Sequence, residues 1–422
     1  MKKKLLIIGG GFAGLQLAKK IDKGNFEVVL IDRLNHHQFQ PLFYQVATSQ
    51  IEPSSISFPL RHIFNRTRDV QIRMADVLNI SPEGGFAETT VGRFEYDYLV
   101  IATGCKTNFF KNEEIERNAF ALKTTYDAIA IRNHILKVFE KAISATESQK
   151  QHLLNLIIVG AGPTGVELAG AFAEIKKEIL PKDYPGIDFS RFTIYLVEGG
   201  KGTLNNMSEL AQRTSQKVLE KMGVKVITET FVKNYNGYTA ELSNGQKVQS
   251  ATVIWAAGVM GNKISGFDNT LWVANNRIKV NRYNQVEGYE NIFALGDIAY
   301  METERYPKAH PQVANVAINQ ARLLAKNLKG ILAGKKLQEY EYKDYGTMAT
   351  IGRNKAVVDL PFIRFAGYPA WVVWMFLHLM LILSVRNKLI IFINWAWSYL
   401  TKDSSLRLIL TPARAADKIS DG

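Results

Sequence analysis

Length, composition and charge exclude several classes of protein. The chain has 422 residues, 47% hydrophobic and 22% charged, which is typical of folded proteins rather than disordered tails, and its length indicates two or three domains. Cys105 is the single cysteine, so an intrachain disulfide, a Cys-x-x-Cys pair and a cysteine-held metal cluster are excluded, and any electron chemistry needs a bound cofactor. The net charge of +13 favours an anionic partner, such as a nucleic acid, an acidic lipid or a phosphorylated ligand.

The start of the chain predicts a strand, a glycine turn, a helix and a second strand. A strand is expected over 4–8, apolar from Leu5 onward. Gly9, Gly11 and Gly14 form a G-x-G-x-x-G turn, an Ala- and Leu-rich segment reaches Lys20, and a second strand is expected over 27–31, apolar over 28–31. The basic opening imitates a signal peptide, but the glycines interrupt the apolar run, so we interpret it as a first strand.

The same pattern returns in the middle of the chain. A strand over 156–159 leads into Gly160, Gly162 and Gly165, followed by a helix over 166–175 and a strand over 192–197. Residues 98–104 and 251–258 follow the first and second copies, and each is read as a buried strand that ends in a turn of small residues. The two copies predict an α/β fold with two Rossmann-like dinucleotide-binding domains.

A glycine turn of this kind binds a pyrophosphate when the next strand ends in an acid that can bind ribose hydroxyls. Asp32 meets that condition for the first copy and Glu198 for the second. Because an acid repels a 2′-phosphate, Glu198 favours NADH over NADPH, although a solvated strand-end carboxylate is the alternative interpretation. Two dinucleotide sites without a cysteine pair indicate FAD and NADH exchanging a hydride directly.

Other helices are expected over 125–151, as a connector, and over 309–329. The last eighty residues then become strongly apolar over 371–385 and 389–400, with four tryptophans and flanking Arg386 and Lys388. Both stretches are shorter than the roughly 20 residues of a spanning helix. They predict an interfacial helix pair on a membrane surface, over about 365–410, with a buried core helix or a dimer seam as the alternatives.

Several motifs resemble the type II NADH dehydrogenases, single-subunit NADH:quinone oxidoreductases bound to the membrane surface. They are NIFALGD over 291–297, HHQFQPLFYQVAT over 36–48, GPTGVELAG over 162–170 and the aromatic C-terminal region. The resemblance covers nearly the whole chain. It implies FAD as cofactor, NADH as donor and a membrane quinone as acceptor.

The resemblance also implies site residues. For FAD they are Gly9, Gly11, Phe12, Ala13, Gly14, Asp32, Arg33, Ala102, Thr103, Gly104, Gly296 and Asp297, and for NADH they are Gly160, Gly162, Pro163, Thr164, Gly165, Glu198 and Gly258. Glu167 matches a carboxylate proposed to lie between the nicotinamide and quinone sites, whereas the alternative is a first-turn helix acid. For the quinone they are Gln45, Asn315, Ala317 and Asn319, where Asn315 and Asn319 replace the glutamines of the family's A-Q-x-A-x-Q pattern.

The expected organisation is an FAD-binding domain over 1–115 and 265–340, an NADH-binding domain over 150–264 and a membrane-anchoring, quinone-site region over 341–422. The expected activity is respiratory NADH:quinone oxidoreduction without proton pumping, by a peripheral protein on the cytoplasmic face of the cell membrane. The apolar tail also offers surface for a homodimer.

Three alternative functions are compatible with parts of this sequence pattern. A soluble reductase of the same fold could deliver electrons to a ferredoxin or another acidic protein. Sulfide oxidation resembles families with paired cysteines, which this chain lacks, and a redox-sensing nucleic-acid binder would need a basic run longer than Lys2 to Lys4. The seven histidines show no metal-ligand spacing, so no metal is predicted, and His36 and His37 are interpreted as loop-packing residues.

Overall fold

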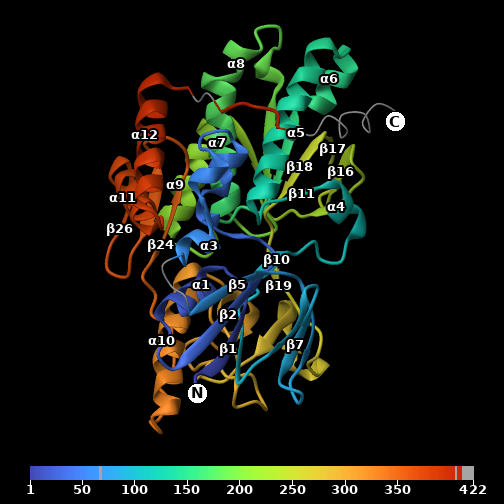
Figure 1. Cartoon of the computed structure of the whole chain (residues 1–422). Coiled ribbons are helices and arrows are strands. Elements are labelled where there is room, and N and C mark those ends of the chain that lie inside the picture. Colours follow the sequence, from blue (N-terminus) through green and yellow to red (C-terminus); the bar gives the residue numbers. More distant parts are fainter. Residues whose placement is uncertain (66–68, 404–405, 411–422) are drawn as a thin grey trace. The chain divides into compact units, whose positions relative to one another are not determined.

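The computed structural model describes residues 1–65, 69–403 and 406–410 (Figure 1). The chain forms two compact units, each assembled from three separate stretches. The first unit comprises Met1–Gln38, Ser57–Lys106 and Val259–Lys343, and the second comprises Phe39–Ile56, Thr107–Gly258 and Asp344–Gly422. The final part of the predicted C-terminal region, 411–422, lies outside the described residues, as do 404–405.

The core of the first unit is a five-stranded parallel sheet in the order β22-β9-β1-β2-β5. Its central strand β1 (Lys3–Ile8) is buried on both faces from Leu5 onward, as expected for a parallel sheet covered on both sides. Helices α1 and α10 pack against one face, where their apolar residues join those of the strands in one core. The elements of this unit are β1 (Lys3–Ile8), α1 (Phe12–Lys20), β2 (Phe26–Asp32), β3 (His36–Gln38), β4 (Ser57–Pro59), α3 (Leu60–Ile63), β5 (Val70–Met74), β6 (Val77–Ser81), β7 (Phe86–Thr89), β8 (Gly92–Glu95), β9 (Tyr98–Ile101), β19 (Val259–Gly261), β20 (Trp272–Val273), β21 (Arg277–Lys279), β22 (Ile292–Ala294), β23 (Ala299–Tyr300) and α10 (Ala314–Leu332).

The second unit repeats this design around a parallel sheet in the order β11-β18-β12-β13-β14. The strand β12 (Asn155–Val159) is buried throughout and leads into the second glycine turn. The elements of this unit are α2 (Phe43–Ala47), α4 (Glu113–Asn118), β11 (Phe120–Ala121), α5 (Thr125–Ser144), α6 (Glu147–Leu153), β12 (Asn155–Val159), α7 (Pro163–Glu178), α8 (Leu180–Asp183), β13 (Thr193–Val197), α9 (Glu209–Lys221), β14 (Val224–Ile227), β15 (Val232–Tyr235), β16 (Thr239–Leu242), β17 (Lys247–Gln249), β18 (Thr252–Trp255), β24 (Thr347–Thr350), β25 (Ala356–Asp359), β26 (Arg364–Gly367), α11 (Tyr368–Leu381) and α12 (Val385–Thr401). The short strand β10 (Cys105–Thr107) lies where the chain passes from the first unit to the second.

The C-terminal part of the second unit consists of the antiparallel sheet β24-β25-β26 and the helices α11 and α12, drawn in orange and red in Figure 1. The two helices pack through aromatic rings. The ring centroids of Trp371 and Tyr399 are 5.6 Å apart and those of Trp374 and Trp395 are 6.0 Å apart. Within the described residues, neither these helices nor any other is long and apolar enough to cross a membrane.

The structure confirms the α/β class with two Rossmann-like sheets and corrects two predicted helices. The connector expected over 125–151 is two helices, because Thr146 forms a capping box with Gln149 that begins α6. The helix expected over 309–329 begins at Ala314. Pro311 has no N–H to donate and disfavours a helical conformation at the preceding residue, so the segment before Ala314 stays extended or turned.

Candidate functional site

The first glycine turn leaves one open position beside the start of α1. A Cβ on Gly9 would lie 2.2 Å from the carbonyl oxygen of Ala102, and a Cβ on Gly14 would lie 1.8 Å from the carbonyl oxygen of Gly9. Gly9 also has a φ of +106°, which favours glycine. A Cβ on Gly11 would meet nothing within 4 Å. Gly9 and Gly14 are therefore required by the chain's own packing, whereas Gly11 keeps free space at a helix N-terminus, where a pyrophosphate can approach the backbone.

Asp32 ends β2 and faces this turn. Its Oδ2 accepts a hydrogen bond of 2.5 Å from the N–H of Gly10, and its Oδ1 accepts one of 2.7 Å from the N–H of Leu34. Burial raises the pKa of this carboxyl above its ordinary value, against the lowering effect of those two donors. His37 packs under the same turn, with Nδ1 3.0 Å from the carbonyl oxygen of Gly10, and burial lowers its pKa to about 4. This neutral ring has the loop-packing role expected for it.

The remaining predicted FAD residues gather at the same edge of the sheet, where neighbouring parallel strands end. Ala102, Thr103 and Gly104 follow β9, and Gly296 and Asp297 follow β22. Phe12 and Ala13 open α1, and Arg33 is exposed directly after β2. Ligands of open α/β sheets bind at this edge, where the strand order reverses on either side of the first strand.

Three side chains that the motifs did not single out for the flavin site fix Gly296 and Asp297. Gln320 Oε1 accepts a hydrogen bond of 2.7 Å from the N–H of Gly296, and Gln312 Nε2 donates one of 2.9 Å to the carbonyl oxygen of Asp297. The thiol of Cys105 donates to Asp297 Oδ2 over 2.9 Å. Cys105 is distant from Asp297 in the sequence, and Gln312 and Gln320 lie outside the motif over 291–297, so that motif gives no signal for them.

The second glycine turn repeats the first. A Cβ on Gly160 would lie 2.8 Å from backbone atoms of Ala256 and Ala257, a Cβ on Gly165 would lie 1.8 Å from the carbonyl oxygen of Gly160, and a Cβ on Gly162 would meet nothing within 4 Å. Pro163 and Thr164 open α7 beside this space, and Gly258 follows β18 with a φ of +98°.

Glu198 accepts a hydrogen bond from the second glycine turn in the same way that Asp32 accepts one from the first. Its Oε2 accepts a hydrogen bond of 2.6 Å from the N–H of Ala161, and its Oε1 accepts one of 2.7 Å from the N–H of Gly200. The carboxylate is therefore held at the strand end by backbone donors and is not a freely solvated side chain.

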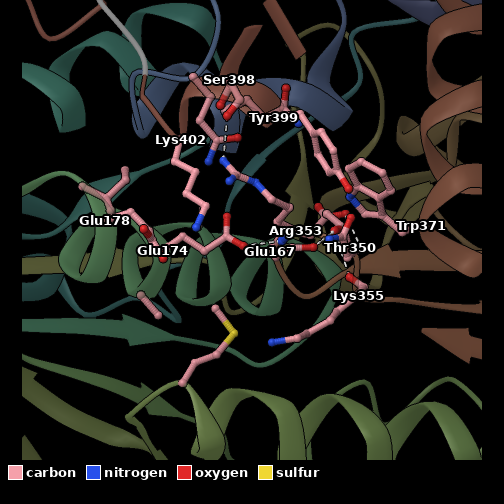
Figure 2. A pocket seen from close by; sticks show the side chains of 18 of the residues that line it. Glu167, Glu174, Glu178, Thr350, Arg353, Lys355, Trp371, Ser398, Tyr399 and Lys402 are labelled. Atoms are coloured by element: carbon pink, nitrogen blue, oxygen red, sulfur yellow. Dashed lines mark hydrogen bonds between the residues drawn. The ribbon is translucent and has the colours of Figure 1, made fainter. Parts of the chain in front are cut away.

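A cavity of about 580 Å³ lies within the second unit, formed by α2, α7, β24 and the two C-terminal helices (Figure 2). Glu167 on α7 lines it and is 8% exposed. Burial raises the pKa of its carboxyl to about 8, although the N–H of Thr350, 3.4 Å from Oε1, and the nearby indole of Trp374 lower it. The indole nitrogen of Trp374 is buried and forms no hydrogen bond with Glu167 or any other described residue. Glu167 lies beyond the first turn of α7, which excludes the alternative of a first-turn helix acid.

Charged and aromatic groups line the rest of this cavity. Glu174 accepts from the backbone N–H of Arg353, and burial raises its pKa. The guanidinium of Arg353 donates to the carbonyl oxygen of Ser398 over 2.9 Å and lies 5.8 Å from the ring centroid of Tyr399. Figure 2 shows Glu167, Glu174, Arg353 and Lys402 directed toward the same space. The cavity therefore combines a protonated carboxyl, cations and flat aromatic walls.

The predicted quinone residues belong to different units. Gln45 lines the cavity and is 4% exposed. Asn315, Ala317 and Asn319 lie on α10 of the first unit, where Ala317 packs in the core and Asn319 Oδ1 accepts from Arg322 over 3.4 Å.

Comparison with known proteins defines the class. A family model described as pyridine nucleotide-disulphide oxidoreductase matches residues 3–321, and a model of the NDH2 C-terminal domain matches residues 345–402. The chain is 32% identical over 419 residues to a type II NADH:quinone oxidoreductase of Mycobacterium tuberculosis, covering 94% of this chain and 88% of that protein. A type II NADH:quinone oxidoreductase of Staphylococcus aureus is 28% identical over 365 residues, covering 84% of this chain and 89% of that one.

Solved structures share the fold. NDH2 of Plasmodium falciparum, solved in complex with NADH, has a TM-score of 0.89 at 21% identity, covering 97% of this chain and 100% of that one. A sulfide:quinone oxidoreductase of Aquifex aeolicus has a TM-score of 0.73 at 21% identity, covering 97% and 96% of the two chains. The fold and the two glycine turns are thus those of the pyridine nucleotide-disulphide oxidoreductases. Within that class, the chain belongs to the type II NADH:quinone oxidoreductases.

Proposed function

We propose that this protein is a respiratory NADH:quinone oxidoreductase that takes a hydride from NADH, passes two electrons to a membrane quinone and pumps no protons. The observation that carries this proposal is the doubled glycine turn, each copy with an open glycine at a helix start and a strand-end carboxylate held toward it. A soluble ferredoxin-type reductase is not favoured, because the NDH2 C-terminal domain model matches residues 345–402.

The first unit is the proposed FAD-binding part. Gly11 leaves room for the pyrophosphate, Asp32 offers a carboxylate to ribose hydroxyls, and Asp297 stands at the end of β22 to bind the ribityl chain. When bound, FAD supplies a ring that can accept a hydride and release an electron pair. Gln312, Gln320 and Cys105 hold the Gly296–Asp297 turn in place for that cofactor.

The second unit is the proposed NADH-binding part. Gly162 leaves the corresponding space, and Glu198 is held at the strand end to bind ribose hydroxyls. A 2′-phosphate would meet this carboxylate with like charge, so NADH is favoured over NADPH.

Glu167 is the proposed proton-holding group. Reduction of a quinone to a quinol consumes two protons. Since burial keeps the Glu167 carboxyl protonated near neutral pH, it can hold a proton beside the cavity that Gln45 also lines. The proposed quinone-binding residues are Gln45, Asn315, Ala317 and Asn319.

The helices α11 and α12 are the proposed membrane-binding surface. Their exposed apolar side chains include Phe376 at 60%, Leu389 at 57%, Trp397 at 62% and Leu400 at 79% exposure. Arg386 and Lys388 begin α12 and suit anionic headgroups. With this surface, we place the protein peripherally on the cytoplasmic face of the cell membrane. A homodimer through part of the same surface is proposed as well, and light scattering of detergent-free protein would measure it.

The test uses purified full-length protein. NADH should bleach the visible absorbance of the bound flavin, and a short-chain quinone should restore it, with steady turnover when both are present. Protein without flavin, or flavin reduced by NADH that no quinone reoxidises, would refute the proposal.

A further inference from the structure

Three residues form a hydrogen-bonded chain in the wall of the second unit's cavity. The indole nitrogen of Trp395, on α12, donates to Gln45 Oε1 over 2.9 Å. The amide nitrogen of Gln45 donates to the Tyr44 hydroxyl over 2.9 Å. All three residues line the cavity that also contains Glu167.

The chemistry of the three side chains determines which group donates and which accepts in each of these hydrogen bonds. An indole nitrogen can only donate, so the oxygen of the Gln45 amide must face Trp395. The NH₂ end of the amide then faces Tyr44, whose oxygen accepts. The hydroxyl proton of Tyr44 consequently has no role in the chain, and among the described residues it is donated to no group.

Tyr44 is held rigidly as a protonated phenol. It is 4% exposed, its ring lies edge-on to Trp374 at 6.4 Å, and its own carbonyl oxygen accepts from the hydroxyl of Thr48 over 2.8 Å. Burial, and then the nearby carboxyl of Glu167, raise the pKa of the Tyr44 hydroxyl well above its ordinary value. Both effects favour the protonated phenol, which is the form that can donate a hydrogen bond.

We propose that the Tyr44 hydroxyl donates a hydrogen bond to a carbonyl oxygen of the quinone in this cavity, and that Trp395 is a positioning residue that acts through Gln45 to keep that donor available. This inference rests on the proposed function. A donor aimed at the quinone oxygen stabilises the negative charge that develops there as electrons arrive. The step involves no transfer of the phenolic proton.

The amide of Gln45 explains why Trp395 is needed. Without the indole donor, nothing among the described residues fixes which end of the amide faces Tyr44. If the Gln45 amide flips, its oxygen faces Tyr44. The Tyr44 hydroxyl then donates to Gln45 and can no longer donate to the quinone. The helix that carries the exposed apolar surface thereby sets the direction of a hydrogen bond inside the cavity.

The test is a mutant cycle on the flavin-loaded protein. Trp395→Phe keeps an aromatic ring and removes the donor, and Tyr44→Phe removes one oxygen. Each should raise the KM for a short-chain quinone or lower kcat by about threefold to tenfold, the value of one hydrogen bond. NADH oxidation with ferricyanide, which accepts electrons without this bond, should be unchanged.

The double variant separates a positioning role from a structural one. If Trp395 acts through Tyr44, adding Trp395→Phe to Tyr44→Phe should change the quinone kinetics no further. Tyr126→Phe also removes one phenolic oxygen, at a position 78% exposed on α5, so it is the matched control and should behave as the parent. Gln45→Met replaces Trp395→Phe in the cycle if the latter fails to fold.

The outcomes are distinct. Additive effects in the double variant, or Tyr44→Phe kinetics equal to those of the parent, would overturn this inference while leaving the proposed function intact. A parent protein that reduces ferricyanide with NADH but turns over no quinone would instead refute the proposed function.

Discussion

Asp32 and Glu198 make the same pair of hydrogen bonds in two separate sheets. Each accepts from a backbone N–H inside the neighbouring glycine turn, over 2.5 Å and 2.6 Å, and from the N–H two residues after itself, over 2.7 Å in both cases. The second bond fixes the carboxylate at the strand end, and the first draws it toward the turn. Two dinucleotide sites are thus built with one local geometry.

Substitutions at Gly11 and Gly14 should separate cofactor binding from folding. Gly11→Ala places a methyl group in open space, so flavin-free protein should unfold at nearly the parent temperature while the flavin content falls. Gly14→Ala places a Cβ 1.8 Å from the carbonyl oxygen of Gly9 and should cost about 3 kcal/mol or more. Circular dichroism measures the unfolding temperature of each variant, and the flavin-to-protein absorbance ratio measures its flavin content. Equal loss of stability in the two variants would contradict this reading of the turn.

Removing the charge of Glu198 should weaken the discrimination against NADPH. Glu198→Gln keeps the side-chain size, removes the negative charge and leaves one oxygen to accept from a backbone N–H. The kcat/KM for NADPH should therefore rise relative to NADH by about tenfold, equivalent to about 1.4 kcal/mol. Steady-state assays with both donors and ferricyanide measure the ratio. Glu220→Gln, exposed on α9, is the control. An unchanged ratio in Glu198→Gln would show that the carboxylate does not meet the 2′ position.

Glu167 should make stability fall as pH rises. Its folded-state pKa is about 8 and its ordinary value is 4.5, so between these pH values the folded protein holds a proton that the unfolded chain has released. The free energy of unfolding therefore falls progressively between pH 4.5 and 8 because of Glu167, and this group causes no further change above pH 8. Glu167→Gln should remove this slope and be more stable than the parent above pH 8. Denaturant unfolding at several pH values measures it, with exposed Glu116→Gln as the control, which should keep the parent's slope.

Polar substitutions on α12 should weaken vesicle binding without affecting NADH oxidation. Phe392 is 53% exposed and Leu400 is 79% exposed, so Phe392→Ser with Leu400→Ser removes apolar surface at little cost to the core. Sedimentation with vesicles containing phosphatidylglycerol should show less bound protein, and added salt should weaken binding further. Phe231→Ser, at a position 58% exposed directly before β15, is the matched control. Equal binding by all three proteins would exclude α12 as the membrane contact.

The parts of the fold that local sequence determines could be predicted. Both glycine turns, the strands around them and the fold class follow from short motifs and apolar runs, and the structure confirms them. Two predicted helix boundaries were wrong. The breaks at Thr146 and before Ala314 depend on a capping box and on one proline.

The cavity could not be assembled from the sequence alone. Its wall brings together Gln45, Glu167, Arg353 and Trp395, which come from four distant stretches of the chain. Such contacts depend on tertiary packing, and no local pattern predicts them. The family resemblance predicts a role for Gln45 and Glu167. Tyr44 lies in the motif over 36–48 but received no role from it, and Glu174 carried no signal.

The interleaving of the two units determines when each can be completed during synthesis. The first unit needs β22 and α10, so on the ribosome the edge of β9 stays unpaired until about residue 294 has emerged. The second unit needs its three C-terminal strands and last two helices, all of which follow residue 343. The exposed apolar side chains of α11 and α12 are therefore translated after every strand of the first unit's central sheet.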